Sequence, residues 1–311
     1  MPPQEARRPG PEGVPVSRCA LPAADNGALL ARQQRRERLL LLGLSAPTLL
    51  AIMVVVFLPI AWLSSLSLFD RGGALTTENY ARIVESELYR GTFYVTFQIS
   101  AAVTVLCVAL GYPLCYWMSR LPARLATLCM VLVLVPFWTS VLVRTYAWLV
   151  LLQRNGLING WLQSLGLIDE PLQLAHNLTG SIIGMVHIML PFLVLPLYAS
   201  MKSIDLDLVR AAVGLGATPR RAFWTVFFPM SLPGLFAGVV LVFVLSLGFF
   251  VTPALLGGGR VQMLAQRIES TITLYSNWGA ASALGVVLLL VTLALIWLLH
   301  RVFGLDRLFA R

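Results

Sequence analysis

The sequence predicts an all-α membrane protein with six transmembrane helices. Hydrophobic residues make up 58% of the 311 residues and charged residues only 12%, about half the charged share of a typical soluble domain. Six long apolar segments can each cross a hydrocarbon core of about 30 Å, for which about 20 helical residues suffice. The expected spans are 39–69, 92–119, 125–152, 178–201, 233–256 and 279–299.

The segment 1–38 precedes the first span and differs from it in composition. It is rich in Pro, Arg, Gly and Ala and ends in an arginine cluster, which predicts a disordered cytoplasmic tail. The apolar run that follows is about twice the length of a signal-peptide core, so we expect it to be a retained span. Residues 39–311 then form the transmembrane domain.

The distribution of Lys and Arg predicts the orientation. The N-terminal tail, the 120–124 turn, the 202–221 segment and the C-terminal tail hold sixteen of them, and the opposite loops hold six. By the positive-inside rule, both termini lie in the cytoplasm. Cytoplasmic loops near anionic lipid therefore explain the net charge of +9. A nucleic-acid partner is not expected, because no basic stripe with interleaved aromatics lies outside the spans.

The chemistry-bearing residues argue against an enzyme. Lys202, the single lysine, follows Met201, so the chain lacks the Gly-Lys-Ser/Thr of a Walker A loop and any ATP hydrolysis needs another subunit. The four cysteines fit neither a disulfide framework nor a zinc site. The three histidines lack metal-binding spacing. We expect no catalytic residue, metal or cofactor.

The segment between the fourth and fifth spans predicts a helix, a break and a second helix. Asp205 and Asp207 place carboxylates where a helix N-terminus favours them. Gly216 is suited to end that helix. Thr218 followed by Pro219 predicts the cap and first residue of the next one. On composition alone, an ordinary loop between spans is an equal alternative.

The order of residues in this segment is more specific than its composition. Ala211-Ala212, then Gly216, then Pro229 and Pro233 after an aromatic run closely resemble the EAA loop of permease subunits of ABC importers. In that family the loop forms a short coupling helix that lies in a groove of the partner ATPase. The resemblance implies that this helix passes the ATP-driven closure of the ATPase pair to the membrane helices.

Arg210 departs from the family pattern, which has Glu before the two alanines. The substitution preserves the helix but reverses one charge, and Asp207 is a candidate substitute for the missing carboxylate. We expect the EAA-like loop to occupy about residues 203–234.

Arg144 is the basic residue embedded in a predicted span. A charge there costs roughly 3 kcal/mol or more, so it needs a water-filled or paired environment or must reach the interface. It is therefore a candidate for either the pathway or helix packing. The neighbouring Trp138, Tyr146 and Trp148 fit an aromatic interface belt or a cation–π site for an amine.

The region around Arg144 carries a second resemblance. Pro-Phe-Trp-Thr-Ser at 136–140, Val-Arg-Thr-Tyr-Ala-Trp at 143–148 and Asn-Gly-Leu-Ile-Asn at 155–159 strongly resemble the third-span region of spermidine/putrescine ABC permeases. With the EAA-like loop, the resemblance covers about 39–303. It implies a type I ABC importer permease fold with its core at about 92–300.

The resemblance also implies a function and a set of partners. It indicates an inner-membrane permease subunit that forms half of the pathway for a polyamine. The partners are an extracytoplasmic binding protein, an ATPase dimer and a second, related permease. One alternative is the same machine with another solute, such as an amino-acid derivative, iron chelate or sulfonate. The other is an ion-coupled carrier working alone, but no Asp or Glu lies in any predicted span.

Overall fold

The computed structural model describes residues 23–70 and 72–303. The chain divides into a first unit that ends at Ala61 and a second that begins at Trp62. The described residues are helical except for connecting segments and an isolated bridge between Phe69 and Leu75. The predicted all-α class is confirmed.

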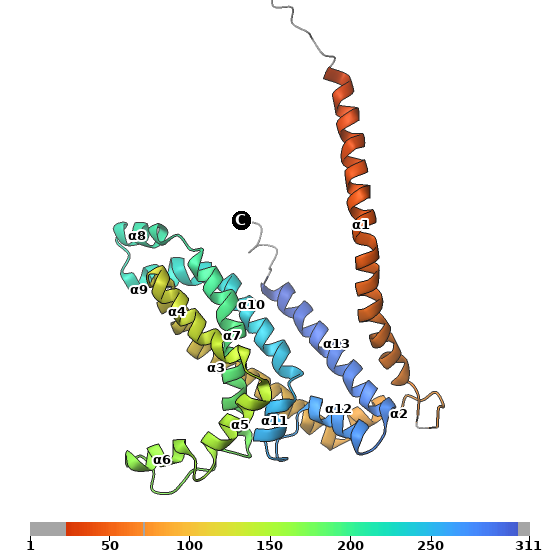
Figure 1. Ribbon diagram of the computed structural model, residues 1–311, viewed down its shortest axis with the longest axis vertical. Coiled ribbons are helices and arrows are strands. Elements are labelled where there is room, and N and C mark those ends of the chain that lie inside the picture. Colours follow the sequence, from red (N-terminus) through yellow and green to blue (C-terminus); the bar gives the residue numbers. More distant parts are fainter. Residues whose placement is uncertain (1–22, 71, 304–311) are drawn as a thin grey trace, which may run out of the picture. The chain divides into compact units, whose positions relative to one another are not determined.

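The helices follow one another through short connections (Figure 1). In chain order they are α1 (Ala23–Leu66), α2 (Glu78–Glu85), α3 (Glu87–Arg120), α4 (Ala123–Leu134), the 3₁₀-helix η1 (Val135–Trp138), α5 (Val141–Leu152), α6 (Leu157–Ser164), α7 (Leu178–Lys202), α8 (Leu206–Gly214), α9 (Pro219–Ala222), the π-helix η2 (Phe223–Phe227), α10 (Phe228–Leu247), α11 (Val251–Leu256), α12 (Leu264–Thr273) and α13 (Trp278–Phe303).

Helix α1 differs from the prediction at its start. It begins at Ala23, so residues 23–38 are helical where the sequence predicted part of a disordered tail. Residues 1–22 of that tail lie outside the described residues. Good helix formers such as Ala, Leu, Gln and Arg fill 28–38, and extending a helix that already exists is far easier than nucleating one.

The predicted third span, 125–152, is wrong as a single straight helix. The described residues contain five single helices suited to cross a membrane, and a sixth candidate formed by the pair Ala123–Trp138 and Val141–Ser164, bent by 97°. The break follows Pro136, which cannot donate a helical hydrogen bond, and falls at Thr139 and Ser140.

The fifth span also begins earlier than predicted. The sequence indicated 233–256, whereas the helix runs continuously over Pro219–Leu247 and α11 is a separate short helix. Pro229 and Pro233 therefore lie inside the span and do not redirect the chain into it. Proline is tolerated in membrane helices because local π or 3₁₀ adjustment satisfies the freed backbone groups, and the π-helix η2 ends at Phe227, two residues before Pro229.

The core of the second unit lies where α3, α7 and α10 pack together. The buried face of α3 combines small side chains such as Ser100, Cys107 and Gly111 with larger ones such as Ile99 and Met118, at helical spacing. Cys107 and Cys115 on this face donate weak hydrogen bonds to the carbonyls of Val186 and Val194, both at 3.7 Å. These cysteines thus act as small packing residues between α3 and α7.

Helices α7 and α10 approach closely because glycines line their contact. A Cβ at Gly238 would lie 2.9 Å from Leu193 Cδ1 and 3.0 Å from the Leu193 carbonyl oxygen. A Cβ at Gly234 would lie 2.2 Å from Ser200 Cβ. Small residues at such positions let membrane helices pack backbone to backbone.

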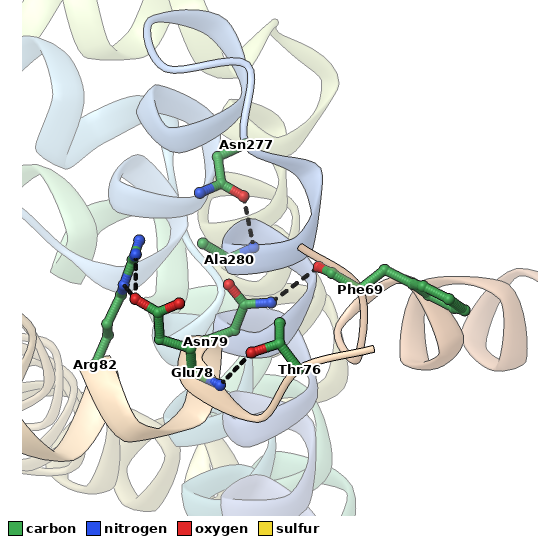
Figure 2. Close-up of polar contacts among 7 residues, drawn as sticks. All are labelled: Phe69, Thr76, Glu78, Asn79, Arg82, Asn277 and Ala280. Carbon is green, nitrogen blue, oxygen red and sulfur yellow. Dashed lines mark hydrogen bonds and ion pairs between the residues drawn. The ribbon is translucent and has the colours of Figure 1, made fainter. Parts of the chain in front are cut away.

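Helix α2 lies against α13, and separate polar contacts tie α2 to the segment after α1 and cap the start of α13 (Figure 2). The buried Asn79 side chain donates to the carbonyls of Ser67 at 3.0 Å and Phe69 at 3.1 Å. Asn277 caps α13 by accepting a hydrogen bond from the Ala280 N–H at 3.0 Å. The segment between the first two predicted spans, 70–91, contains α2 and the first residues of α3.

The short helices of the second unit gather at opposite ends of its long helices (Figure 1). Helices α8 and α9 lie at one end, here called the α8 end. Helices α6, α11 and α12 lie at the other. The two candidate sites occupy different places in this arrangement, one at the α8 end and the other at the bend between η1 and α5.

Candidate functional site

Helix α8 is closed at both ends by local hydrogen bonds. Asp205 is its N-cap, and its carboxylate accepts from the Asp207 N–H at 2.9 Å. Beyond the last turn, Gly216 has φ +92° and its N–H donates to the Val213 carbonyl. The Ala217 N–H donates to the Ala212 carbonyl, which completes a Schellman motif. The predicted helix and its ending are confirmed.

One face of α8 packs on the protein and the other is open. Leu206 and Val209 pack against a buried cluster that includes Phe227. Leu208 is 48% exposed and Leu215 is 90% exposed. Leu208 lies in α8 and Leu215 is its C-cap residue, and a spacing of seven residues, or two turns, places both on one side of the helix axis. The structure therefore leaves an apolar stripe on α8 uncovered by the described chain.

Charges of opposite sign lie beside this stripe. Arg210 Nη1 is 2.7 Å from Asp207 Oδ1, and both side chains are about three-quarters exposed. Asp207 is the candidate substitute for the Glu that the family pattern has at position 210. Its carboxylate instead forms an ion pair with Arg210, the residue present at that position. The two alanines differ: Ala211 is exposed and Ala212 half-buried.

The connection from α8 to the membrane helices is short and ordered by a second cap. Thr218 accepts from the Arg221 N–H at 3.3 Å, with Pro219 at the first helical position. The helix then continues through η2 into α10. A groove of about 460 Å³ runs between α3 and α9, lined by Tyr112, Pro113, Tyr116, Pro219, Arg220 and Phe223.

Arg120, the last residue of α3, stacks on Tyr116, one of the residues that line this groove. The Arg120 guanidinium carbon lies 4.3 Å from the centroid of the Tyr116 ring and 6.0 Å from that of Phe227. The Phe223 ring packs edge-on against Tyr116. Cation–π contacts of this kind hold the end of α3 against η2.

The second candidate site lies at the bend in the third span. Arg144, in the first turns of α5, is only 8% exposed, and its Nε and Nη1 atoms have no hydrogen-bond partner among the described residues. It lines a cavity of about 410 Å³ together with Phe137, Thr139, Ser140, Val141, Ile188, Met189, Phe192, Leu245 and Phe249.

The aromatic residues expected around Arg144 separate into two groups. Trp148 is half-buried one turn further along α5, and its ring lies 5.6 Å from that of His187 on α7. Trp138 is 88% exposed and Tyr146 is 52% exposed. Arg144 thus lines the cavity, Trp148 packs against His187 and a separate buried cluster that includes Leu256, and Trp138 and Tyr146 are exposed.

Comparison with known proteins assigns the chain to a family. Residues 111–304 match the family model described as binding-protein-dependent transport system inner membrane component. The chain belongs to this family. It is therefore a transport component and not an enzyme, and a carrier working alone is excluded.

Two relatives extend the similarity beyond the matched residues. The spermidine/putrescine transport system permease protein PotB of Haemophilus influenzae is 32% identical over 252 residues, which cover 79% of this chain and 88% of that protein. PotB of Escherichia coli K12 is 32% identical over 246 residues, covering 77% and 89%.

A solved structure has the same fold. A chain of a bacterial alginate ABC transporter, in complex with an alginate pentasaccharide-bound periplasmic protein, superposes with a TM-score of 0.69 at 15% identity. The superposition covers 86% of this chain and 95% of that one. The chain thus has the type I ABC importer permease fold that the sequence predicted.

Several residues of the two sites were not identified from sequence. Thr139 and Ser140 form the break beside Arg144, and their position between two apolar runs after a proline was the available signal. Arg120 follows Tyr116 by one helical turn, a spacing that favours the stacking seen here. Nothing in the sequence indicated that His187 would meet Trp148. Across the described residues, no group of three His, Cys, Asp or Glu could hold a metal.

Proposed function

We propose that this permease forms half of the translocation pathway for a polyamine, putrescine or spermidine. The observation that carries the proposal is the 32% identity to two PotB permeases over more than three-quarters of the chain. The resemblance of the segments 136–140, 143–148 and 155–159 to the same permeases supports it. An extracytoplasmic binding protein delivers the amine, and a second, related permease supplies the other half of the pathway.

In this proposal, α8 is the coupling helix. Its open apolar stripe, Leu208 and Leu215, inserts into a groove of one subunit of an ATPase dimer, and Asp207 and Arg210 lie at the edge of the contact. Ala211 and Ala212 leave room for close approach. The helix Pro219–Leu247 then carries the movement of α8 into the membrane. Gly216 forms the turn that ends α8, and Pro229 and Pro233 lie within the helix that follows it.

This assignment sets the orientation in the inner membrane. The ATPase binds in the cytoplasm, so the α8 end is cytoplasmic, in agreement with the positive-inside count. Both termini are then cytoplasmic, and α6, α11 and α12 face the binding protein. Arg144 and Trp148 lie on the inner face of the pathway wall, while Trp138 and Tyr146 face lipid or the second permease.

The proposal is tested by purification and uptake together. The chain, tagged at its C-terminus, is extracted in mild detergent from its native membrane and its partners are identified by mass spectrometry. We expect an ATPase with a Walker A motif and a second permease of the same family. Uptake of radiolabelled putrescine and spermidine is then compared in cells with and without this chain. Equal amine uptake in both strains would reject the polyamine assignment while leaving the importer family intact.

A further inference from the structure

Arg144 is a buried cation with no counter-charge in the lining of its cavity. It is more than nine-tenths buried, and its Nε and Nη1 atoms find no acceptor among the described residues. No Asp or Glu lies in any predicted span. Because an uncompensated buried charge is strongly destabilising, such a group is normally paired or coordinated. The cavity lining holds no Asp or Glu, so a counter-charge for Arg144 has to come from outside it.

The surroundings of Arg144 add further hydrogen-bond donors. Helix α5 begins at Val141, and the first N–H groups of a helix have no partner inside it. Its N-cap, Ser140, makes no side-chain capping bond. The helix dipole places partial positive charge at the same end. Ser140, Val141 and Arg144 all line the cavity, so a helix N-terminus and an unpaired guanidinium share one space.

We propose that this cavity binds a carboxylate group, held by the guanidinium of Arg144 and the first-turn amides of α5. A guanidinium offers N–H donors in a planar fork that matches a carboxylate. The cavity walls are otherwise mainly apolar, with Phe137, Ile188 and Phe192 among them, and a low-polarity surrounding strengthens such a pair. Broken membrane helices elsewhere direct their N-terminal ends at anionic groups in the same way.

The carboxylate can come from two sources. A polyamine carries only cationic amines and has no acceptor for these donors. If the proposed polyamine function holds, the carboxylate is therefore an acidic side chain of the second permease, reaching the bend that this chain leaves uncovered at Trp138. If the solute itself carries a carboxylate, the solute fills the cavity. The choice between the sources rests on the proposed function, but the carboxylate site does not.

The single lysine of the chain allows a direct chemical test. In a Lys202→Arg background, Arg144→Lys places one lysine amine in the cavity. The assembled importer is treated with dicyclohexylcarbodiimide, which activates a carboxylate; the amine then forms an amide and dicyclohexylurea leaves. Peptide mass spectrometry identifies what is joined to position 144. The matched control is Arg154→Lys in the same background, since Arg154 is exposed.

The two sources give different products. An amide to an Asp or Glu of the second permease, absent from the Arg154→Lys control, supports the site with the partner as its source. An amide to added 4-aminobutyrate, the carboxylated analogue of putrescine, supports the site with the solute as its source. The absence of both products at position 144 overturns the proposal. This readout is independent of whether the unmodified importer takes up putrescine, so the two proposals can fail separately.

Uptake of the importer's solute by charge variants gives a second measurement. Arg144→Gln keeps a hydrogen-bonding side chain but removes the charge, and we expect about a tenfold or greater loss of uptake, as for a lost charge-assisted hydrogen bond. Arg144→Lys keeps the charge and should retain more uptake than Arg144→Gln. Both are compared at equal amounts of chain in the membrane. Full uptake by Arg144→Gln overturns the proposal, since a residue used only for packing tolerates that change.

Discussion

Asp207 and Arg210 form an ion pair across one turn of α8, with 2.7 Å between Oδ1 and Nη1. Because their side chains are 76% and 77% exposed, solvent screens the pair and its loss costs at most about 1 kcal/mol. We therefore expect Asp207→Asn to leave the melting temperature of the purified importer nearly unchanged. Any loss of ATP-driven transport in this variant then arises at the ATPase contact. A large drop in melting temperature would contradict this account of the pair.

The apolar stripe of α8 gives a prediction for assembly. Leu215 is 90% exposed, so Leu215→Asp disturbs no packing within the chain. Burying a leucine in a partner contributes roughly 1.5–3 kcal/mol, and an aspartate there should weaken ATPase retention about tenfold or more. Co-purification of the ATPase with the tagged chain measures this loss.

Leu165→Asp is the matched control for that experiment. Leu165 is also strongly exposed, at 72%, but it follows α6 at the opposite end of the unit (Figure 1). This variant should retain the ATPase. Equal retention by both variants would remove α8 from the docking surface.

The end of α8 depends on one glycine and not on its neighbour. Gly216 has φ +92°, whereas a Cβ at Gly214 would meet nothing and the backbone there is helical. Gly216→Val should strain the Schellman turn by about 1–2 kcal/mol, reducing transport at normal membrane insertion. Gly214→Ala should be tolerated, since alanine favours a helix by about 1 kcal/mol over glycine. Initial uptake rates, normalised to membrane amount, distinguish the two; equal rates would argue against a coupling role for the turn.

The contact between α7 and α10 predicts a steric effect. A Cβ at Gly234 would lie 2.2 Å from Ser200 Cβ and 2.7 Å from the Pro196 carbonyl oxygen, neither of which can move freely. Gly234→Ala should destabilise the packing by about 1–3 kcal/mol and lower the melting temperature. Gly285→Ala is the control, because a Cβ there meets no atom within 4 Å. Similar melting temperatures for the two variants would show that the helices separate more easily than this contact implies.

Local signals predicted the α8 region well because its structure is set by its own residues. The helix start at Asp205 and Asp207, the helix end near Gly216 and the Thr218-Pro219 start are each confirmed. Such features depend on hydrogen bonds between residues two to five apart, so the order of residues is sufficient to predict them.

Hydropathy was less informative where a span is interrupted. The segment 125–152 carries no charge apart from Arg144 and is apolar enough on average to be predicted as one span, yet the chain bends by 97° near Thr139. The side chain of Arg144 is buried by α7 and α10, which supply Ile188 and Leu245 to its cavity. These contacts join residues far apart in the sequence, so periodicity within one segment cannot predict them.

The uninterrupted helix from Pro219 to Leu247 acts as a lever in the proposed coupling. At 1.5 Å per residue its 29 residues extend roughly 40 Å, so a tilt of about 10° at one end displaces the other by about 7 Å. Had the span begun at Pro233, as the sequence predicted, a joint before it would separate α8 from the bilayer and absorb such a tilt. In the proposed coupling, the intact helix carries a small tilt beside the ATPase to its far end without loss.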